Sequence, residues 1–162
     1  MLPEIRTILY ATDLSEHAVL AFRYALSLAQ RYDARIVVVH AVEPLSPMTK
    51  SMVEVYLTPE TRERLEREGR ERLMERLRER LELFCQEELC TDPQGRDRVR
   101  DIRLVEGRPA EVILDEAERV RADLIVMGSH GHSAVGEILL GSTAHRVTQR
   151  ARVPVLLVRE DA

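Results

Sequence analysis

Aromatic residues and cysteine are scarce in this chain. It has no tryptophan, and all aromatic residues together make up 4% of the sequence. Flavins are usually held between aromatic side chains, so a flavin-binding domain is disfavoured. Cys85 and Cys90 lie five residues apart, a spacing that fits neither a C-x-x-C redox motif nor a metal-ligand set. We therefore predict two reduced cysteines near a helix end.

An excess of positive charge and long apolar runs are also missing. The net charge is −4 with acids and bases interspersed, whereas a nucleic-acid partner would favour a basic patch. No run of about 18 apolar residues occurs, and the first residues lack the basic segment of a secretion signal. We expect a cytoplasmic protein that binds neither nucleic acid nor membrane.

Short apolar segments alternate with helical patterns along the chain, whose length fits one domain, 1–162. Strands are expected at 5–11, 35–42, 99–105, 123–127 and 153–158. This alternation predicts an α/β fold with a doubly wound parallel sheet and helices on both faces. The third strand is more polar than the others, so we place it at an edge. From the pattern alone, a flavodoxin-type domain is the alternative.

Three residues mark expected helix starts. Ser15 and Ser142 are each placed to cap a helix, because a serine hydroxyl can accept from the free N–H groups of the first turn. Pro109 suits the first turn of the helix before the fourth strand.

The middle of the chain is interpreted as two segments of different character. Residues 43–58 contain scattered prolines and are expected to be a variable loop or lid, whose Met48, Met52, Val55 and Tyr56 could cover a ligand or pack on a partner. Residues 59–90 are expected to form one long charged helix, with leucines at 65, 73, 77 and 81 and Glu–Arg pairs at i,i+4. Its surface is interpreted as a solvated face or as a partner-binding helix.

A glycine-rich segment joins the fourth strand to the last helix. It runs from Gly128 through Gly131 to Gly141, and Ser142 and Thr143 open the helix. Glycine lets a ligand approach the backbone, and a helix start offers unpaired N–H groups and a positive dipole end. Together these features predict an anion cradle. The spacing is neither G-x-G-x-x-G nor a P-loop, because no lysine follows Gly141.

The spacing Gly128-x2-Gly131-x9-Gly141-Ser142 resembles the nucleotide-binding signature of the universal stress protein family, ATP-binding branch. Residues 8–15 resemble the first strand and loop of that family, and residues 153–158 resemble its last strand. The resemblance covers nearly the whole chain except the detail of about residues 44–100. It implies a single five-stranded sheet of order 3-2-1-4-5, of the adenine nucleotide alpha-hydrolase-like type.

The resemblance also implies which residues hold the nucleotide. The phosphates are assigned to the loop from Gly128 to Thr143. Asp13 is assigned to the ribose and base end, and the backbone near Ala41 to the edge of the adenine. Apolar walls are assigned to Ala11, Val126 and Met127. The complete predicted nucleotide-binding set is Ala11, Thr12, Asp13, Ala41, Val126, Met127, Gly128, His130, Gly131, Gly141, Ser142 and Thr143. Because parallel strands end at one edge of the sheet, Asp13, Ala41 and Gly128 should converge on one crevice.

Asp13, Ser142 and His130 raise the question of metal and catalysis. Asp13 and Ser142 could bind Mg²⁺ or Mn²⁺ that arrives with ATP, since hard cations prefer oxygen ligands. Asp13 could instead cap the helix near Ser15. His130 is expected to hydrogen-bond a phosphate, and a metal pair with His132 is disfavoured because no third ligand is evident.

We interpret the chain as an ATP-binding regulatory protein of the stress-response type with little intrinsic catalysis, because the loop has no lysine for the leaving phosphates. The alternatives are a slow ATPase or phosphotransfer enzyme and a nucleotide-free interaction module. The last strand is apolar and would form an exposed edge, which favours a homodimer across Val153, Val155, Leu156 and Leu157. A regulatory protein partner of unknown identity is also expected.

Overall fold

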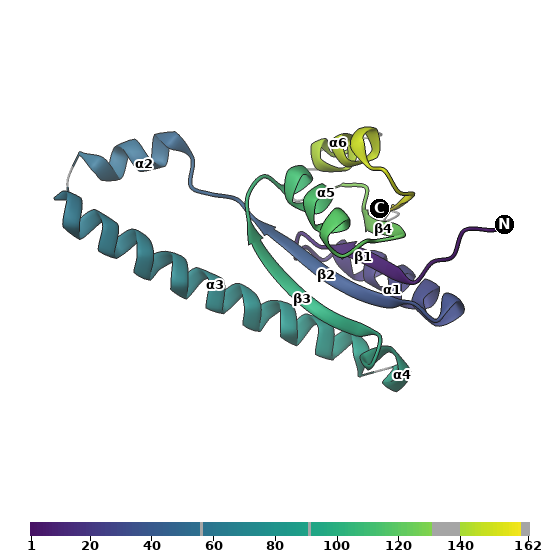
Figure 1. Ribbon diagram of the computed structural model, residues 1–162. Helices are drawn as coiled ribbons and strands as arrows, with labels where there is room; N and C mark the ends of the chain where they lie inside the picture. The colour runs from purple at the N-terminus through teal and green to yellow at the C-terminus, as the bar shows by residue number, and fades with distance from the viewer. Residues whose placement is uncertain (56, 91, 131–139, 160–162) are drawn as a thin grey trace.

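One five-stranded parallel sheet organises the molecule (Figure 1). The computed structural model describes residues 1–55, 57–90, 92–130 and 140–159. The strands are β1 (Thr7–Ala11), β2 (Arg35–Val42), β3 (Val99–Glu106), β4 (Leu124–Gly128) and β5 (Val155–Val158). They pair in parallel in the order β3-β2-β1-β4-β5. The predicted doubly wound fold and strand order are confirmed, and β1 lies in the middle of the sheet.

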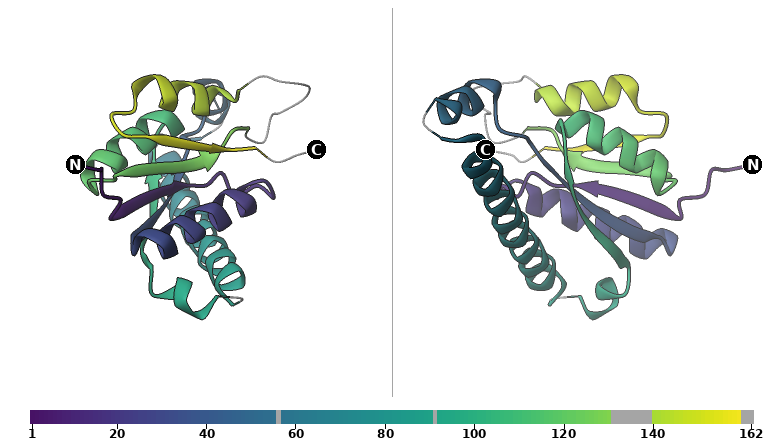
Figure 2. Two further views of the ribbon diagram at one scale, coloured as in Figure 1. Left: turned by 90° about the vertical axis from the view of Figure 1, so that its right-hand side faces the viewer. Right: turned by 60° about the vertical axis from the view of Figure 1, so that its left-hand side comes forward.

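Helices cover both faces of the sheet (Figure 2). They are α1 (Ala18–Tyr32), α2 (Pro47–Glu54), α3 (Pro59–Leu89), α4 (Pro93–Arg96), α5 (Pro109–Arg119) and α6 (Ser142–Arg150). One core cluster packs α1 and the C-terminal part of α3 on the sheet, and a second packs α5 and α6 on the opposite face. Every residue of β1 is buried, as expected for a strand covered on both faces. No helix among the described residues is long and apolar enough to span a membrane.

The two edge strands differ in character. β3 has no buried residue and joins β2 through a register shift between Ile36 and Val37, in agreement with its predicted edge position. At the other edge, the last strand begins at Val155 and not at Val153 as predicted. Pro154 has no N–H for the ladder, although its carbonyl accepts from Ile125 N–H at 3.0 Å.

Both serine caps predicted from the sequence are wrong. Helix α1 begins at Ala18 with His17 as its cap residue, and Ser15 instead binds the Asp13 side chain. Helix α6 begins at Ser142 itself, with Gly141 as the cap residue. The first turn of α1 is tied to the core, because Tyr10 Oη donates to Ala18 O at 2.7 Å. Burial raises the pKa of Tyr10, so this donor keeps its proton.

The segment 43–58 is not only a loop, because it contains the helix α2. The predicted long helix is confirmed as α3, which begins at Pro59 behind the Thr58 cap. We call α2 together with residues 59–76 of α3 the arm. Figure 1 shows the arm extending beyond the sheet, on the side where β2 ends.

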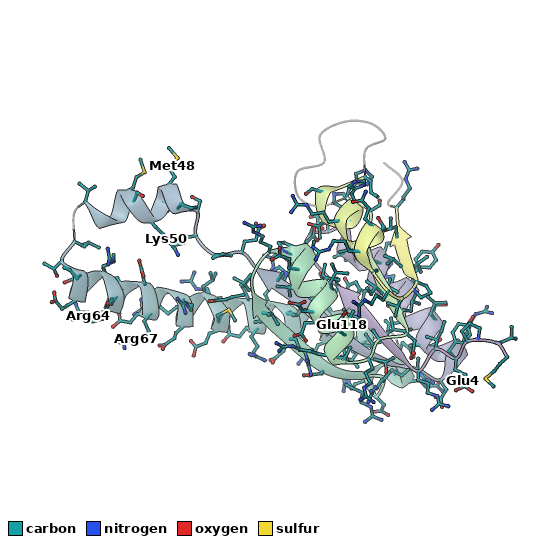
Figure 3. The ribbon with its side chains drawn as sticks, turned by 45° about the horizontal axis from the view of Figure 1, so that its top comes forward. Glu4, Met48, Lys50, Arg64, Arg67 and Glu118 are labelled. Carbon is teal, nitrogen blue, oxygen red and sulfur yellow. The ribbon has the colours of Figure 1, made fainter. Side chains whose placement is uncertain are left out.

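The arm has little core of its own. Leu65 and Leu73 are each 47% exposed, whereas Leu81 is fully buried, so α3 joins the core only in its C-terminal half. On α2, Met48 and Met52 are also exposed. Figure 3 shows Met48 on the outer side of α2 and Lys50 on the side toward α3. Thus α2 turns apolar side chains to solvent.

Candidate functional site

A cavity of about 530 Å³ opens at the carboxyl ends of β1, β2 and β4. This is the switch point of the sheet, because β2 and β4 lie on opposite sides of β1. Its walls come from the turn after β1, the end of β2, both ends of the segment between β4 and α6, and from α3 and α5. The lining residues used below are Ala11, Thr12, Asp13, Leu14, His17, His40, Ala41, Leu77, Arg80, Pro109, Ile113, Met127, Gly128, Ser129, His130, Gly141, Ser142 and Thr143.

The turn after β1 places the Asp13 carboxylate at the cavity. Its Oδ1 accepts from the N–H and the hydroxyl of Ser15, at 2.9 and 2.5 Å. Thr12 Oγ1 accepts from Leu14 N–H at 3.0 Å, and Thr12 N–H donates to Val39 O at 3.0 Å. These bonds form a turn of the Asx and hydroxyl type, which holds an acidic side chain at the end of a central strand.

The end of β2 contributes an oriented imidazole. His40 Nδ1 lies 2.8 Å from Thr12 O. A carbonyl can only accept, so Nδ1 carries the proton, and in the neutral ring Nε2 is left as an acceptor. His40 therefore ties β2 to the turn that carries Asp13, directly before Ala41.

Backbone hydrogen bonds of Ser129, directly after β4, join it to the residue before α6 and to the end of β5. Ser129 N–H donates to Val158 O and Gly141 N–H donates to Ser129 O, both at 2.9 Å. Ser129 Oγ lies 2.8 Å from His130 Nδ1. The N–H groups of Ser142 and Thr143 belong to the first turn of α6, where helix geometry provides no partner within the helix.

Gly128 leaves room for a ligand. A Cβ at this position would have His130 O as its only neighbour within 4 Å among the described residues, at 3.5 Å. Within the part of the chain that the structure describes, the backbone of Gly128 therefore has free space at the cavity wall, which would suit an anion cradle.

Most of the predicted nucleotide-binding residues line this cavity. Val126 does not, because neighbouring strand residues face opposite sides: Val126 is buried in the cluster with α1 and Met127 in the cluster with α5 and α6. Gly131 and His132 lie outside the described residues. All the other members of the predicted set are in the lining.

Several lining residues were missed from the sequence. Pro109 and Ile113 follow β3 at the same end of the sheet, so the topology alone could have indicated them. His40 could have been found from its place next to Ala41. Arg80 carried no such signal, because it lies within a run of arginines that resembles a solvated helix face.

The oxygen ligands for a divalent cation are few. Asp13 and Ser142 both line the cavity, and so does Glu43, a second carboxylate that directly follows β2. The described residues contain no group of three or more His, Cys, Asp or Glu side chains that could hold a metal ion. A divalent cation at this end of the sheet would therefore take most of its ligands from water or from a bound ligand, as Mg²⁺ commonly does.

Comparison with known proteins identifies the family. The model of the universal stress protein family matches residues 4–159. The chain belongs to this family. It is 39% identical over 154 residues to a universal stress protein of Thermus aquaticus, a match that covers 95% of this chain and 98% of the relative.

The chain is also similar in sequence and in fold to other members of the family. The chain is 30% identical to universal stress protein MJ0577 of Methanocaldococcus jannaschii over 95% of this chain and 94% of the relative. The solved structure of MJ0577 superimposes with a TM-score of 0.76 and covers 99% of both chains. A universal stress protein crystallised in complex with cAMP has the same fold, with a TM-score of 0.60 at 23% identity over 97% of each chain.

Proposed function

We propose that this universal stress protein binds ATP at the cavity and acts as a regulatory protein with little catalysis of its own. The observation that carries the proposal is the convergence of the Asp13 turn, the end of β2, Gly128 and the start of α6 on one cavity of about 530 Å³. Small-molecule sites commonly have volumes of about 300–1,000 Å³. The fold is shared with a universal stress protein crystallised with an adenine nucleotide, cAMP, which supports this ligand class.

The arrangement of donors suggests how ATP would lie. The first-turn N–H groups at Ser142 and Thr143, their hydroxyls and the positive end of α6 suit the phosphates. The Asp13 carboxylate suits the ribose hydroxyls, and Ala11 and Met127 provide apolar walls for the base near Ala41. Each charge-assisted hydrogen bond contributes about 1.5–3 kcal/mol. After the cost of immobilising the ligand, micromolar affinity is expected.

A divalent cation, Mg²⁺ or Mn²⁺, would neutralise phosphate charge in the bound state. Asp13 and Ser142 would contribute oxygen ligands, directly or through water. They stand at the two sides of the switch point, next to β1 and at the start of α6.

Titration calorimetry with Mg-ATP tests the proposal. We expect binding at micromolar affinity, which Thr143→Ala weakens because it removes a hydroxyl at the phosphate end. The matched control is Thr148→Ala on the same helix, whose hydroxyl binds the carbonyls of Ala144 and His145 and which does not line the cavity. Absence of heat up to millimolar Mg-ATP would contradict the proposal.

A slow ATPase is the second candidate. It is favoured by the presence of Arg80 and His130 in the lining, because phosphoryl transfer needs a cation or a proton-transfer group near the phosphates. We give it second place because no described lining residue is a lysine and no activated nucleophile is evident.

We further propose a cytoplasmic homodimer formed through β5. This strand is an edge that pairs only with β4 among the described residues, and its apolar residues Val155, Leu156 and Leu157 are partly exposed. Val153, just before the strand, is also partly exposed. An uncovered apolar edge invites pairing, and a second copy across a two-fold axis would cover it. The exposed arm supports an additional regulatory protein partner, whose binding would respond to nucleotide occupancy.

A further inference from the structure

The turn that carries Asp13 contains an unfavourable backbone conformation. Leu14 has φ of 61°, in the left-handed region that a branched side chain rarely adopts. Such a conformation persists only where the surroundings hold it in place. The side chain of Leu14 is held because it is 9% exposed and belongs to the core cluster under α1. Its N–H is held by Thr12 Oγ1.

The carbonyl of Leu14 is held from a distant part of the chain. Arg80 Nη2 donates to Leu14 O at 3.0 Å, across a separation of 66 residues. The base of Arg80 is itself fixed, because the next residue, Leu81, is fully buried. Leu77, one turn before Leu81, packs on the same cluster. The guanidinium therefore reaches the turn from the point where α3 leaves the core and the arm begins.

Arg80 is also the arginine of the cavity. Among the described lining residues it is the one arginine, and none is a lysine; the other basic side chains there are histidines. A guanidinium carries five N–H donors in a fixed plane, and the bond to Leu14 uses one of them. The same side chain can hold the turn and still present donors and a permanent positive charge to an anionic ligand.

We infer that Arg80 is a positioning residue for the ligand: it fixes the Asp13 turn through Leu14 O and places a cation at the α3 side of the cavity. The long helix α3 thus contributes a residue to the binding site, although the sequence of its outer half is typical of a solvated charged surface. The affinity component of this inference rests on the proposed nucleotide function, whereas the order of the turn does not.

Two measurements on the full chain test the role of Arg80. Calorimetry with Mg-ATP compares the wild type with Arg80→Met, Arg80→Lys and the control Arg78→Met, an exposed arginine of the same helix that does not line the cavity. We expect Arg80→Met to weaken binding about tenfold and Arg78→Met to leave it unchanged. Arg80→Lys should return to within about threefold of the wild type, because an ammonium keeps the charge and one donor to the carbonyl.

Amide hydrogen exchange of the ligand-free proteins is the second measurement. The N–H groups of Leu14 and Ser15 are protected by bonds within the turn. Arg80→Met should speed their exchange several-fold, with no change in the amides of β1. If either the affinity or the exchange of the turn is the same in Arg80→Met as in the wild type, the inference is wrong. If the wild type binds no nucleotide, the proposed function fails, and the exchange data alone then decide whether Arg80 positions the turn.

Discussion

Replacement of Gly128 by alanine should change stability and ligand affinity in opposite directions. The added Cβ would lie 3.5 Å from His130 O, which is ordinary van der Waals contact. Among the described glycines, positive φ occurs at Gly107, so the backbone at Gly128 suits alanine. A compatible Gly→Ala change stabilises a protein by about 0.4–1 kcal/mol through the unfolded chain. For a domain of this size, the melting temperature should rise by about 1–4 °C.

Binding should suffer from the same methyl group. Gly128 lines the cavity, and the methyl would take the space in which a phosphate or ribose approaches the backbone. Loss of one charge-assisted hydrogen bond, worth about 1.5–3 kcal/mol, weakens affinity about tenfold or more. The assays are thermal unfolding without ligand and calorimetric titration with Mg-ATP.

Gly69 provides the matched control. It lies in the exposed middle of α3, and a Cβ there meets nothing within 4 Å among the described residues. Gly69→Ala should therefore stabilise the helix by about 0.8–1 kcal/mol and leave ATP affinity unchanged. If Gly128→Ala bound ATP like the wild type, the nucleotide would not approach this backbone and our placement of the ligand would be refuted. A fall in melting temperature would refute the packing argument.

Three further predictions concern assembly, turnover and alkaline stability. Sedimentation equilibrium should show a dimer that Val155→Lys or Leu157→Lys shifts toward monomer, with circular dichroism to check that the fold persists; a monomeric wild type at tens of micromolar would contradict the β5 interface. ATP hydrolysis by the pure protein should stay below about 1 s⁻¹, and a faster rate would show that the cavity catalyses. Burial raises the pKa of Cys85 to about 12, so the unfolded chain loses this proton first as the pH rises. The free energy of unfolding should therefore fall by up to about 1.4 kcal/mol per pH unit between about pH 9 and pH 12. Denaturant titration should find a shallower fall in Cys85→Ala but not in Cys90→Ala, at the exposed cysteine; equal slopes in all three proteins would contradict this.

The strands could be predicted because two signals agree, whereas their order follows from the family resemblance, since the pattern alone also fits a flavodoxin-type domain. Continuous β-branched runs such as 36–39 indicate strands buried on both faces, and strict alternation with helices leaves few topologies. Helix starts were less predictable. Ser15 has the right residue type for a cap, but its hydroxyl binds Asp13, two residues earlier, and α1 begins at Ala18, whose carbonyl accepts from the buried Tyr10 hydroxyl. The residue type of Ser15 alone could not show which partner its hydroxyl takes.

In the site, too, some residues could be predicted from sequence patterns and others depend on how the chain packs. Residues at strand ends, such as Asp13, Ala41 and Gly128, could be predicted because parallel strands bring their carboxyl ends to one edge. Val126 was assigned as a wall on resemblance, and the side to which it points depends on strand pleating and register, which the apolar run 124–127 does not display. α2 was missed because Pro44 and Pro47 indicate a loop, whereas Pro47 is in fact the first residue of a short helix.

Arg80 marks the limit of sequence reasoning in this chain. Within 59–89 the arginines are hard to tell apart, because they alternate densely with glutamates and several form i,i+4 pairs such as Glu68–Arg72. Arg80 has no such pair, since Arg76 and Phe84 lie four residues before and after it, but this difference alone does not indicate a contact with the turn after β1. What distinguishes Arg80 is the rotation of α3 against the sheet, and that rotation is set by buried residues further along the helix, Leu81, Cys85 and Leu89. These side chains place the guanidinium of Arg80 within hydrogen-bond distance of the carbonyl of Leu14, although Arg80 as a whole residue is exposed, as Arg78 is. The role of Arg80 is therefore set by apolar contacts of nearby residues on α3, beginning with its direct neighbour Leu81.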